Sequence, residues 1–342
     1  MNLLLRHHPR MFLLFFFSFF PGGLPLQEGV QMETLANGMR ILVLPQGEAP
    51  VAAFHLLVRA GSRNELPGKG GLAHLAEHLV FHGSDRLGSR NWPAEQRALQ
   101  AADRAWKAWK KARDNPSPRV DEETLADLRQ EFLDARAEAG ALGDPGAFDR
   151  LIERAGGRDQ NASADADSIR FTVSLPANRA EQWFWLMREL IERPVMRGFY
   201  TERDVIEEER RMRLESNPLN ALLARLYAAA FPSHPYGRPV FGAPGEIAGL
   251  DRGDLLSFWR GNVVPRGMIL AVVGRVEPAA IFRLAREYFG GFRPGLRPAP
   301  PPGPSPGAEG GKRVELESDA PEGAGCCIAC WPSFSTGASK SS

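Results

Sequence analysis

Three histidines and a glutamate lie close together in the stretch HLAEHLVFH, residues 74–82. If this stretch is a helix, His74 and His78 are four positions and about 40° apart, so both imidazoles leave the same face. Two imidazole nitrogens at this spacing can hold a zinc ion. Glu77 lies on the same side and could accept a proton from a water molecule, because zinc lowers the pKa of a water that it binds to roughly 7. The alternative is a helix whose polar side chains only face solvent, and the motif alone does not decide between the two.

A catalytic zinc site uses three protein ligands, so a third must come from elsewhere in the chain. The acidic segment at 199–218 carries Glu202 and Glu209 seven positions apart, which places them two turns apart on one face of a helix. The same segment also fits a surface helix with charge pairs such as Glu209 and Arg213, each worth only about a few tenths of a kcal/mol. Both interpretations stay open on these residues alone.

The segments around these residues predict an α+β fold, in which a mixed or antiparallel sheet has helices packed on one face. Asn37 and Gly38 interrupt an apolar run at 32–45 and indicate a hairpin. Residues 51–62 have the composition of a buried strand. Further strands are expected at 168–176 and 266–276, and helices at 68–84, 178–192, 199–216, 219–230, 251–260 and 277–292. His82 is expected to do no more than end the first of these helices, where a cation is favoured. Strands and helices that follow one another in this order are typical of an α+β domain.

Residues 91–140 differ from their surroundings, because they are strongly charged and carry two apolar stripes at helical spacing. We predict a helical hairpin within an insertion at about 91–156. Packing of one helix on the other, or on the body of the protein, explains such stripes better than a cofactor site does. The two stripes consist of Leu99, Ala102, Trp106 and Trp109, and of Leu125, Leu128, Phe132 and Ala135.

The overall composition excludes some classes of function. The 342 residues include 42 basic and 41 acidic side chains, so no basic excess is present to neutralise nucleic-acid phosphates. The three cysteines all lie within residues 326–330, and a disulfide framework is therefore not expected in the folded part.

Both ends of the chain predict segments outside the folded domain at 26–292. Residues 1–25 contain basic residues, then the apolar run MFLLFFFSFF, then Pro and Gly. This pattern predicts a signal peptide or N-terminal anchor, and thus a secreted or periplasmic protein, which an uncleaved segment would hold at a membrane. Residues 293–311 are expected to be a Pro/Gly-rich linker. Residues 312–342 begin with a strand-like run and then lose periodicity, which predicts the disordered, truncated start of a second half.

Taken together, these features resemble the inverted-motif zinc metallopeptidases of the insulinase/pitrilysin type, a family that includes the mitochondrial processing peptidases. The resemblance covers about residues 30–292. The segments that carry it are TLANGMRILVLP, RAGSRNELPGKGGLAHLAEHLVFHGS, DQNASADADSIRFTVSLP, ERDVIEEE, HPYGRPVFG and AVVGRV.

The resemblance implies a role for each candidate residue. His74, His78 and Glu209 would bind Zn²⁺, Glu77 would activate the water, and Glu202 would be the supporting carboxylate that orients the ligands. A further pair, Asn161 and Ala162, would begin the edge strand that binds a peptide substrate by strand addition.

The sequence also departs from the family pattern. Ala164 and Phe171 stand where a threonine and a tyrosine are common, and the insertion lengthens the interval between the second histidine and the distal glutamate. Family members place a second half over the zinc, and we expect this sequence to hold only the start of that half.

The resemblance therefore implies a zinc-dependent endopeptidase that acts on peptides or small unfolded proteins. The alternatives are a non-catalytic or partner-dependent subunit, completed by a second insulinase-type subunit, and a truncated fragment with little activity alone. A purely structural zinc site fits less well, because such sites favour cysteine and the folded region has none.

Overall fold

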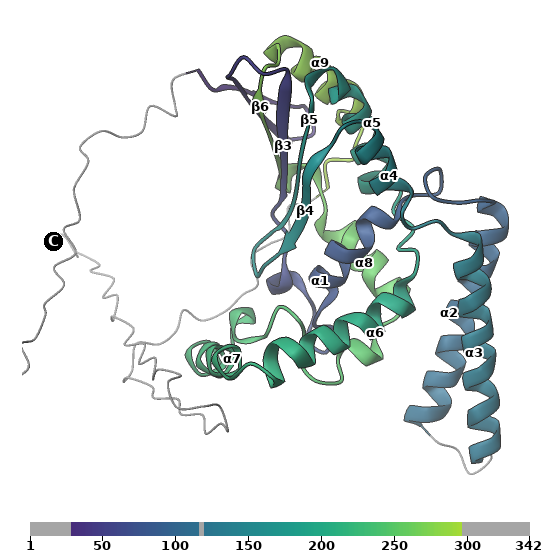
Figure 1. Ribbon diagram of the computed structural model, residues 1–342. Helices are drawn as coiled ribbons and strands as arrows, with labels where there is room; N and C mark the ends of the chain where they lie inside the picture. The colour runs from purple at the N-terminus through teal and green to yellow at the C-terminus, as the bar shows by residue number, and fades with distance from the viewer. Residues whose placement is uncertain (1–28, 116–119, 296–342) are drawn as a thin grey trace, which may run out of the picture.

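The fold is built on one six-stranded sheet. The computed structural model describes residues 29–115 and 120–295 (Figure 1). The predictions for residues 1–25, for most of the linker and for 312–342 lie outside these ranges. The sheet order is β1-β2-β6-β3-β5-β4, and only β2 and β6 pair in parallel. The strands are β1 (Gln31–Thr34), β2 (Arg40–Pro45), β3 (Val51–Val58), β4 (Arg158–Ala164), β5 (Ile169–Pro176) and β6 (Met268–Gly274).

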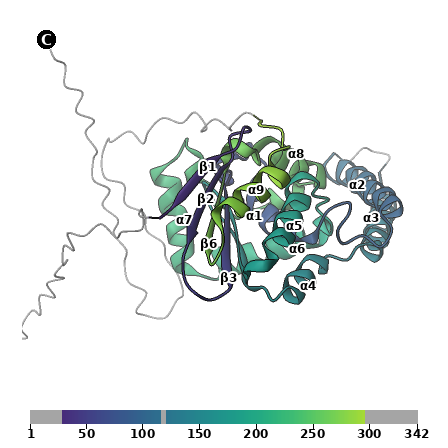
Figure 2. The same cartoon turned by 90° about the horizontal axis from the view of Figure 1, so that it is seen from above.

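One face of the sheet forms the core. Along β5, every second residue is buried, and Ala52, Phe54, Leu56 and Val58 are buried in the same alternation on β3. This period of two directs one set of side chains towards α5 (Ala180–Glu192) and α9 (Pro278–Phe289), which lie on the same side of the sheet (Figures 1 and 2). Phe54 stacks on Trp183 of α5 with 4.6 Å between ring centroids. The predicted α+β architecture, with helices on one face, is confirmed.

Below the sheet in Figure 1 lie α1 (Leu72–Leu79) and three further helices, two of which, α6 (Phe199–Arg210) and α8 (Arg252–Asn262), contact α1. The helix predicted at 68–84 is shorter than expected, because Gly71 precedes it with a φ of 93° and Gly83 follows its last 3-10 turn with a φ of 102°. These left-handed conformations favour glycine and end the helical path. Of the three further helices, α6 continues as a π-helical turn at Arg211–Glu215, and the remaining one is α7 (Pro218–Ala230).

The predicted helical hairpin is present and projects from the body (Figures 1 and 2). It consists of α2 (Trp92–Asp114) and α3 (Glu122–Leu142), which pack along each other. The Asn91 side chain accepts a hydrogen bond from Ala94 N, and that of Asp121 from Thr124 N, so each helix begins at a capping residue. A short helix, α4 (Ala147–Arg154), was not predicted, because its eight residues give only two buried apolar positions, Phe148 and Ile152.

A buried ion pair joins the hairpin to the body. Arg197, in the loop before α6, pairs with Glu95 of α2 and donates to the carbonyl oxygens of Ser84 and Leu87 at 3.0 and 3.1 Å. Both charged residues are almost completely buried, so removing either partner would leave an uncompensated charge in the interior. None of the described helices is both long and apolar enough to cross a membrane.

Candidate metal centre

The short helix α1 presents the first half of the site. Its start is capped by the carboxylate of Glu65, which accepts hydrogen bonds from Ala73 N at 2.7 Å and Gly71 N at 3.1 Å. Glu65 is 5% exposed, and its burial raises its pKa to about 8 although the two N–H donors favour the charged form. No sequence pattern marks this residue as functional. Its function in the fold is to satisfy backbone groups at the start of the helix that carries the histidines.

The predicted ligand atoms converge. Glu209 Oε2 on α6 lies 3.6 Å from Nε2 of His74 and 3.6 Å from Nε2 of His78. One ligand atom from each of these three residues lies within 4.8 Å of the others, close enough for a single metal ion. Burial lowers the pKa of His74 to about 3, and the nearby His78 and Arg213 add to this effect. A neutral imidazole is the form that binds a metal, so the donor set fits a divalent cation such as zinc.

Glu202 contacts the opposite side of the second histidine. Its Oε2 lies 3.4 Å from Nδ1 of His78, while Glu209 faces Nε2 of the same ring. The two carboxylates therefore share one face of α6, as their seven-residue spacing predicted. This hydrogen bond raises the pKa of His78 above its usual value and lowers that of Glu202. An arrangement of this kind fixes the tautomer, with hydrogen on Nδ1 and a free lone pair on Nε2.

Glu77 lies beside the ligand set and is not part of it. Burial raises its pKa, opposed by the charge on His78 and by a backbone hydrogen bond from Ala164 at the end of β4. Glu77 is thus a half-buried carboxylate between the metal-binding residues and the edge strand. Its position is suitable for a base that takes a proton from water.

Two further residues, neither of them predicted from the sequence to be part of the site, enclose the ligands. Phe241 packs edge-on against His74 with 4.8 Å between ring centroids. Arg213 lies over the Phe241 ring and also pairs with Glu209, whose Oε1 is 2.6 Å from the arginine Nε. Glu209 can therefore form the charge pair with Arg213 and serve as a metal ligand at the same time, because Oε1 pairs with Arg213 and Oε2 faces the histidines.

The strand β4 carries Asn161 and Ala162 and lies at the edge of the sheet, paired on one side with β5. Its pairing is irregular between Arg158 and Asn161, and within this stretch Asp159 has a φ of 54°. Ala162 N donates to Asn161 Oδ1 at 2.9 Å. The resemblance implied that this pair begins an edge strand. The pair lies on the edge strand but within it, because β4 begins at Arg158, before the irregular stretch.

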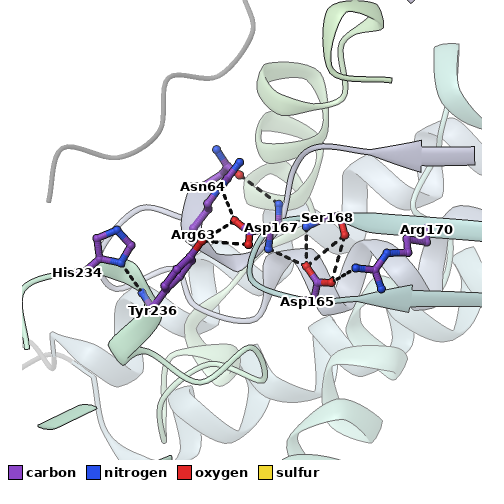
Figure 3. Close-up of polar contacts among 9 residues, drawn as sticks. Arg63, Asn64, Asp165, Asp167, Ser168, Arg170, His234 and Tyr236 are labelled. Carbon is purple, nitrogen blue, oxygen red and sulfur yellow. Dashed lines mark hydrogen bonds and ion pairs between the residues drawn. The ribbon is translucent and has the colours of Figure 1, made fainter. Parts of the chain in front are cut away.

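A polar cluster holds the turn that joins β4 to β5 (Figure 3). Tyr236 donates to both carboxylate oxygens of Asp167 at 2.8 and 3.0 Å, and Arg63 forms an ion pair with the same carboxylate. Inside the turn, Asp165 Oδ1 accepts from the backbone N–H of Asp167 and Ser168 at 2.7 Å each. The cluster thus ties the end of the edge strand nearest Glu77 to two loops of the body.

His82 makes one contact beyond the role expected for it at the end of the helix. This residue lies in the 3-10 turn after α1, and its Nδ1 hydrogen-bonds the carbonyl oxygen of Arg197 at 2.8 Å. His82 is the basic residue of the last turn, as expected, and through this hydrogen bond it also connects the end of that turn to the loop that leads into α6.

Comparison with known proteins identifies the family. Residues 40–101 and 141–244 match the family model described as insulinase (peptidase family M16), and residues 249–338 match the model described as the peptidase M16 inactive domain. The chain belongs to the insulinase (M16) peptidase family. The residues between the two parts of the first match, 102–140, include most of α2 and α3.

Relatives of this insulinase-family chain include named zinc proteases. The zinc protease PqqE of Helicobacter pylori is 25% identical over 269 residues, which are 78% of this chain and 47% of that protein. A probable mitochondrial-processing peptidase subunit beta of Schizosaccharomyces pombe is 25% identical over 76% of this chain and 45% of its own length. The crystal structure of a protease from Helicobacter pylori has the same fold, with a TM-score of 0.59 over 81% of this chain and 53% of that one, at 24% identity. The chain therefore spans about half the length of these relatives.

Proposed function

We propose that this chain is a zinc-dependent endopeptidase that hydrolyses peptide bonds in peptides or small unfolded proteins. The observation that carries the proposal is the convergence of His74, His78 and Glu209, with Glu77 beside them but outside the ligand set. Three protein ligands are typical of a catalytic zinc site, whereas structural sites usually have four.

Each residue has a separate task in this proposal. Zinc bound here would polarise the scissile carbonyl and acidify a water molecule. Glu77 would take the proton from the attacking water and pass it to the leaving amine, which a carboxylate with a raised pKa does more readily. Glu202 would hold the hydrogen of His78 Nδ1 and so keep Nε2 directed at the ligand set.

The peptide would bind by adding a strand to β4. An edge strand offers backbone N–H and C=O groups to a further strand, and Asn161 and Ala162 lie on this edge. The hydrogen bond between Ala164 and Glu77 would bring a peptide bound at the edge close to the base. The apolar N-terminal run is the basis for proposing that the protein acts outside the cytoplasm.

A partner-dependent subunit is the second candidate function. The match of residues 249–338 to an inactive-domain model and the half-length coverage of the relatives favour it. In that case the chain would bind zinc but would need a second insulinase-type subunit to cleave peptides.

The test combines zinc content with peptide cleavage. We expect one zinc per purified chain, cleavage of an unstructured peptide, and loss of at least about a hundred-fold in kcat for Glu77→Gln with its zinc retained. Glu208→Gln, on the exposed part of α6, is the matched control and should keep its activity. A chain without stoichiometric zinc would overturn the proposal. Zinc binding without cleavage, restored by a second subunit, would support the partner-dependent function.

A further inference from the structure

The two carboxylate oxygens of Glu209 face different partners. Oε2 lies 3.6 Å from Nε2 of His74 and 3.6 Å from Nε2 of His78, on the side where a metal would bind. Oε1 forms an ion pair with Arg213 and lies 2.6 Å from its Nε. The arginine therefore does not occupy the place of the metal, because it contacts the oxygen that the histidines leave free.

Arg213 reaches this oxygen from the turn in which α6 widens into a π-helix. The turn spans Arg211–Glu215, and Ser216 N donates to the carbonyl oxygen of Arg211, five residues earlier, at 3.1 Å. Single π-helical turns within α-helices are rare and are frequently found at functional sites. The spacing of four residues places Arg213 on the side of the helix that carries Glu209. The backbone thus directs the guanidinium group to the proposed ligand.

A second contact holds the arginine in this position. The Arg213 side chain is 58% exposed, and freely exposed charge pairs contribute only about 0–1 kcal/mol, because solvent screens them. Here the Glu209 side chain is only 17% exposed, and Cζ of Arg213 lies 5.3 Å from the centre of the Phe241 ring. Phe241 in turn packs edge-on against His74. The arginine is therefore held against the same group of residues that would bind the metal.

The pairing of Oε1 matters because a carboxylate has two oxygens that can accept, and either or both could bind a metal. A catalytic zinc site has three protein ligands and keeps its fourth position for water or substrate. His74, His78 and one oxygen of Glu209 supply three ligand atoms, so binding through both oxygens would fill the fourth position. To do so, Oε1 would have to leave its positively charged partner.

We propose that Arg213 is a positioning residue that keeps Glu209 bound to the metal through Oε2 alone, and so keeps the fourth position open. This inference rests on the proposed zinc-dependent function. Without the arginine, Oε1 turns to the metal and competes with any fourth ligand, while the metal itself stays bound. A residue that only orients a ligand gives the opposite pattern, because its loss weakens metal binding by about 10–100-fold and leaves the fourth position open.

The test uses the full chain loaded with cobalt(II), whose visible spectrum depends on its ligands and their geometry. Imidazole is the probe of the fourth position, because it binds metals in its uncharged form and does not depend on a nearby positive charge. Arg213→Met should retain one cobalt per chain. It should bind imidazole at least about ten-fold more weakly than the wild-type chain, because a tethered oxygen competes at a high effective concentration.

Arg211→Met is the matched control for this substitution. Its side chain is 56% exposed, lies in the same turn and pairs with Glu208, outside the ligand set. This variant loses the same charge and should bind imidazole as the wild-type chain does. Equal melting temperatures of the variants would show that they remain folded.

Arg213→Lys tests whether the charge contact is responsible. A lysine four positions after a glutamate forms the same kind of pair, so this variant should bind imidazole within about three-fold of the wild-type affinity. Unchanged imidazole affinity or loss of cobalt in Arg213→Met would overturn the proposal, as would a lysine variant that binds imidazole as weakly as the methionine variant. A wild-type chain that binds no cobalt would overturn the proposed function as well. None of these measurements depends on peptide cleavage.

Discussion

The two helices that supply the ligand set are held in place by different kinds of contact. In α1, six of the eight residues are buried, and five of these six are leucine or alanine within the main core. In α6, five of twelve are buried, and three of those five are Tyr200, Arg203 and Arg210. The first half of the site is thus part of the apolar interior, while the second half depends largely on polar and aromatic contacts.

The inserted hairpin provides many of the contacts to α6. Asp103 of α2 accepts from the Tyr200 hydroxyl at 2.9 Å and pairs with Arg252 of α8 at 2.6 Å. Arg136 of α3 pairs with Asp204 at 3.0 Å, and the Trp106 ring packs against Arg203. Apolar packing is non-directional, whereas hydrogen bonds hold a helix at a defined position along its axis. The insertion therefore serves to position the helix that carries Glu202 and Glu209.

The largest expected effect is the loss of the metal when a ligand on either helix is removed. His74→Ala and Glu209→Ala should each reduce bound zinc to well below one per chain, because two ligands are left where a catalytic site needs three. Mass-spectrometric metal analysis after gel filtration measures this. Glu207→Ala, two positions away and outside the ligand set, should keep its zinc. If Glu209→Ala retained full zinc, the third ligand would have to be another residue.

A core substitution on α1 should destabilise the whole domain. Leu75 is 0% exposed, so Leu75→Ala should lower the free energy of unfolding by about 2–5 kcal/mol, through lost burial and the resulting cavity. Urea unfolding of the metal-free chain measures this. Leu66, which is 71% exposed, provides the control, and Leu66→Ala should change the free energy by less than about 0.5 kcal/mol. Equal effects of the two substitutions would contradict the assignment of α1 to the core.

On α6, loss of the supporting carboxylate should affect the metal more than the fold. Glu202→Gln should weaken zinc binding by about 10–100-fold, because the amide holds the His78 ring less firmly than a carboxylate does. Competition with a chelating dye measures the affinity, and thermal unfolding should change little. Unchanged zinc affinity would mean that this hydrogen bond does not orient the ligand.

The difference between α1 and α6 also determines which site residues could be predicted from the sequence. His74, Glu77 and His78 lie on one short helix, so their spacing alone places them on one side of it. The contact of Glu209 with both histidines depends on how α6 packs against α1, and no local pattern encodes it. Its role came from the resemblance to a family.

Other parts of the site and fold could not be predicted for related reasons. Glu65 is recognisable as a helix cap only once Gly71 and Ala73 are seen to donate to it. Phe241 reaches His74 from a loop, where no periodicity marks buried positions. The buried strands, the long helices and the hairpin were predictable because apolar residues repeat along them, whereas β4 has no such repeat and was expected only from the resemblance.

A weaker polar contact tests the role of the insertion. Asp103→Asn should lower the free energy of unfolding by about 1 kcal/mol, since the amide cannot form a charge pair with Arg252. Zinc affinity should fall by a few-fold, and added salt should reduce the difference from the wild-type chain. Asp127→Asn, on the exposed face of α3, is the control for the charge change and should leave both quantities unaltered. Unaltered zinc affinity for Asp103→Asn would show that the hairpin does not position α6.

The smallest expected effect is a shift in pH dependence, and it again distinguishes the two helices. Burial raises the pKa of Glu77 on α1 above its ordinary 4.5, while the hydrogen bond with His78 lowers that of Glu202 on α6. The base must be ionised to accept a proton, so kcat/KM should rise with pH through the pKa of Glu77, with a midpoint above 4.5. At saturating zinc, Glu202→Gln should leave this midpoint in place, because Glu202 is already ionised throughout that range. If the midpoint moved with Glu202→Gln, the group that controls kcat/KM would lie on α6. The pH dependence would then no longer support Glu77 as the base.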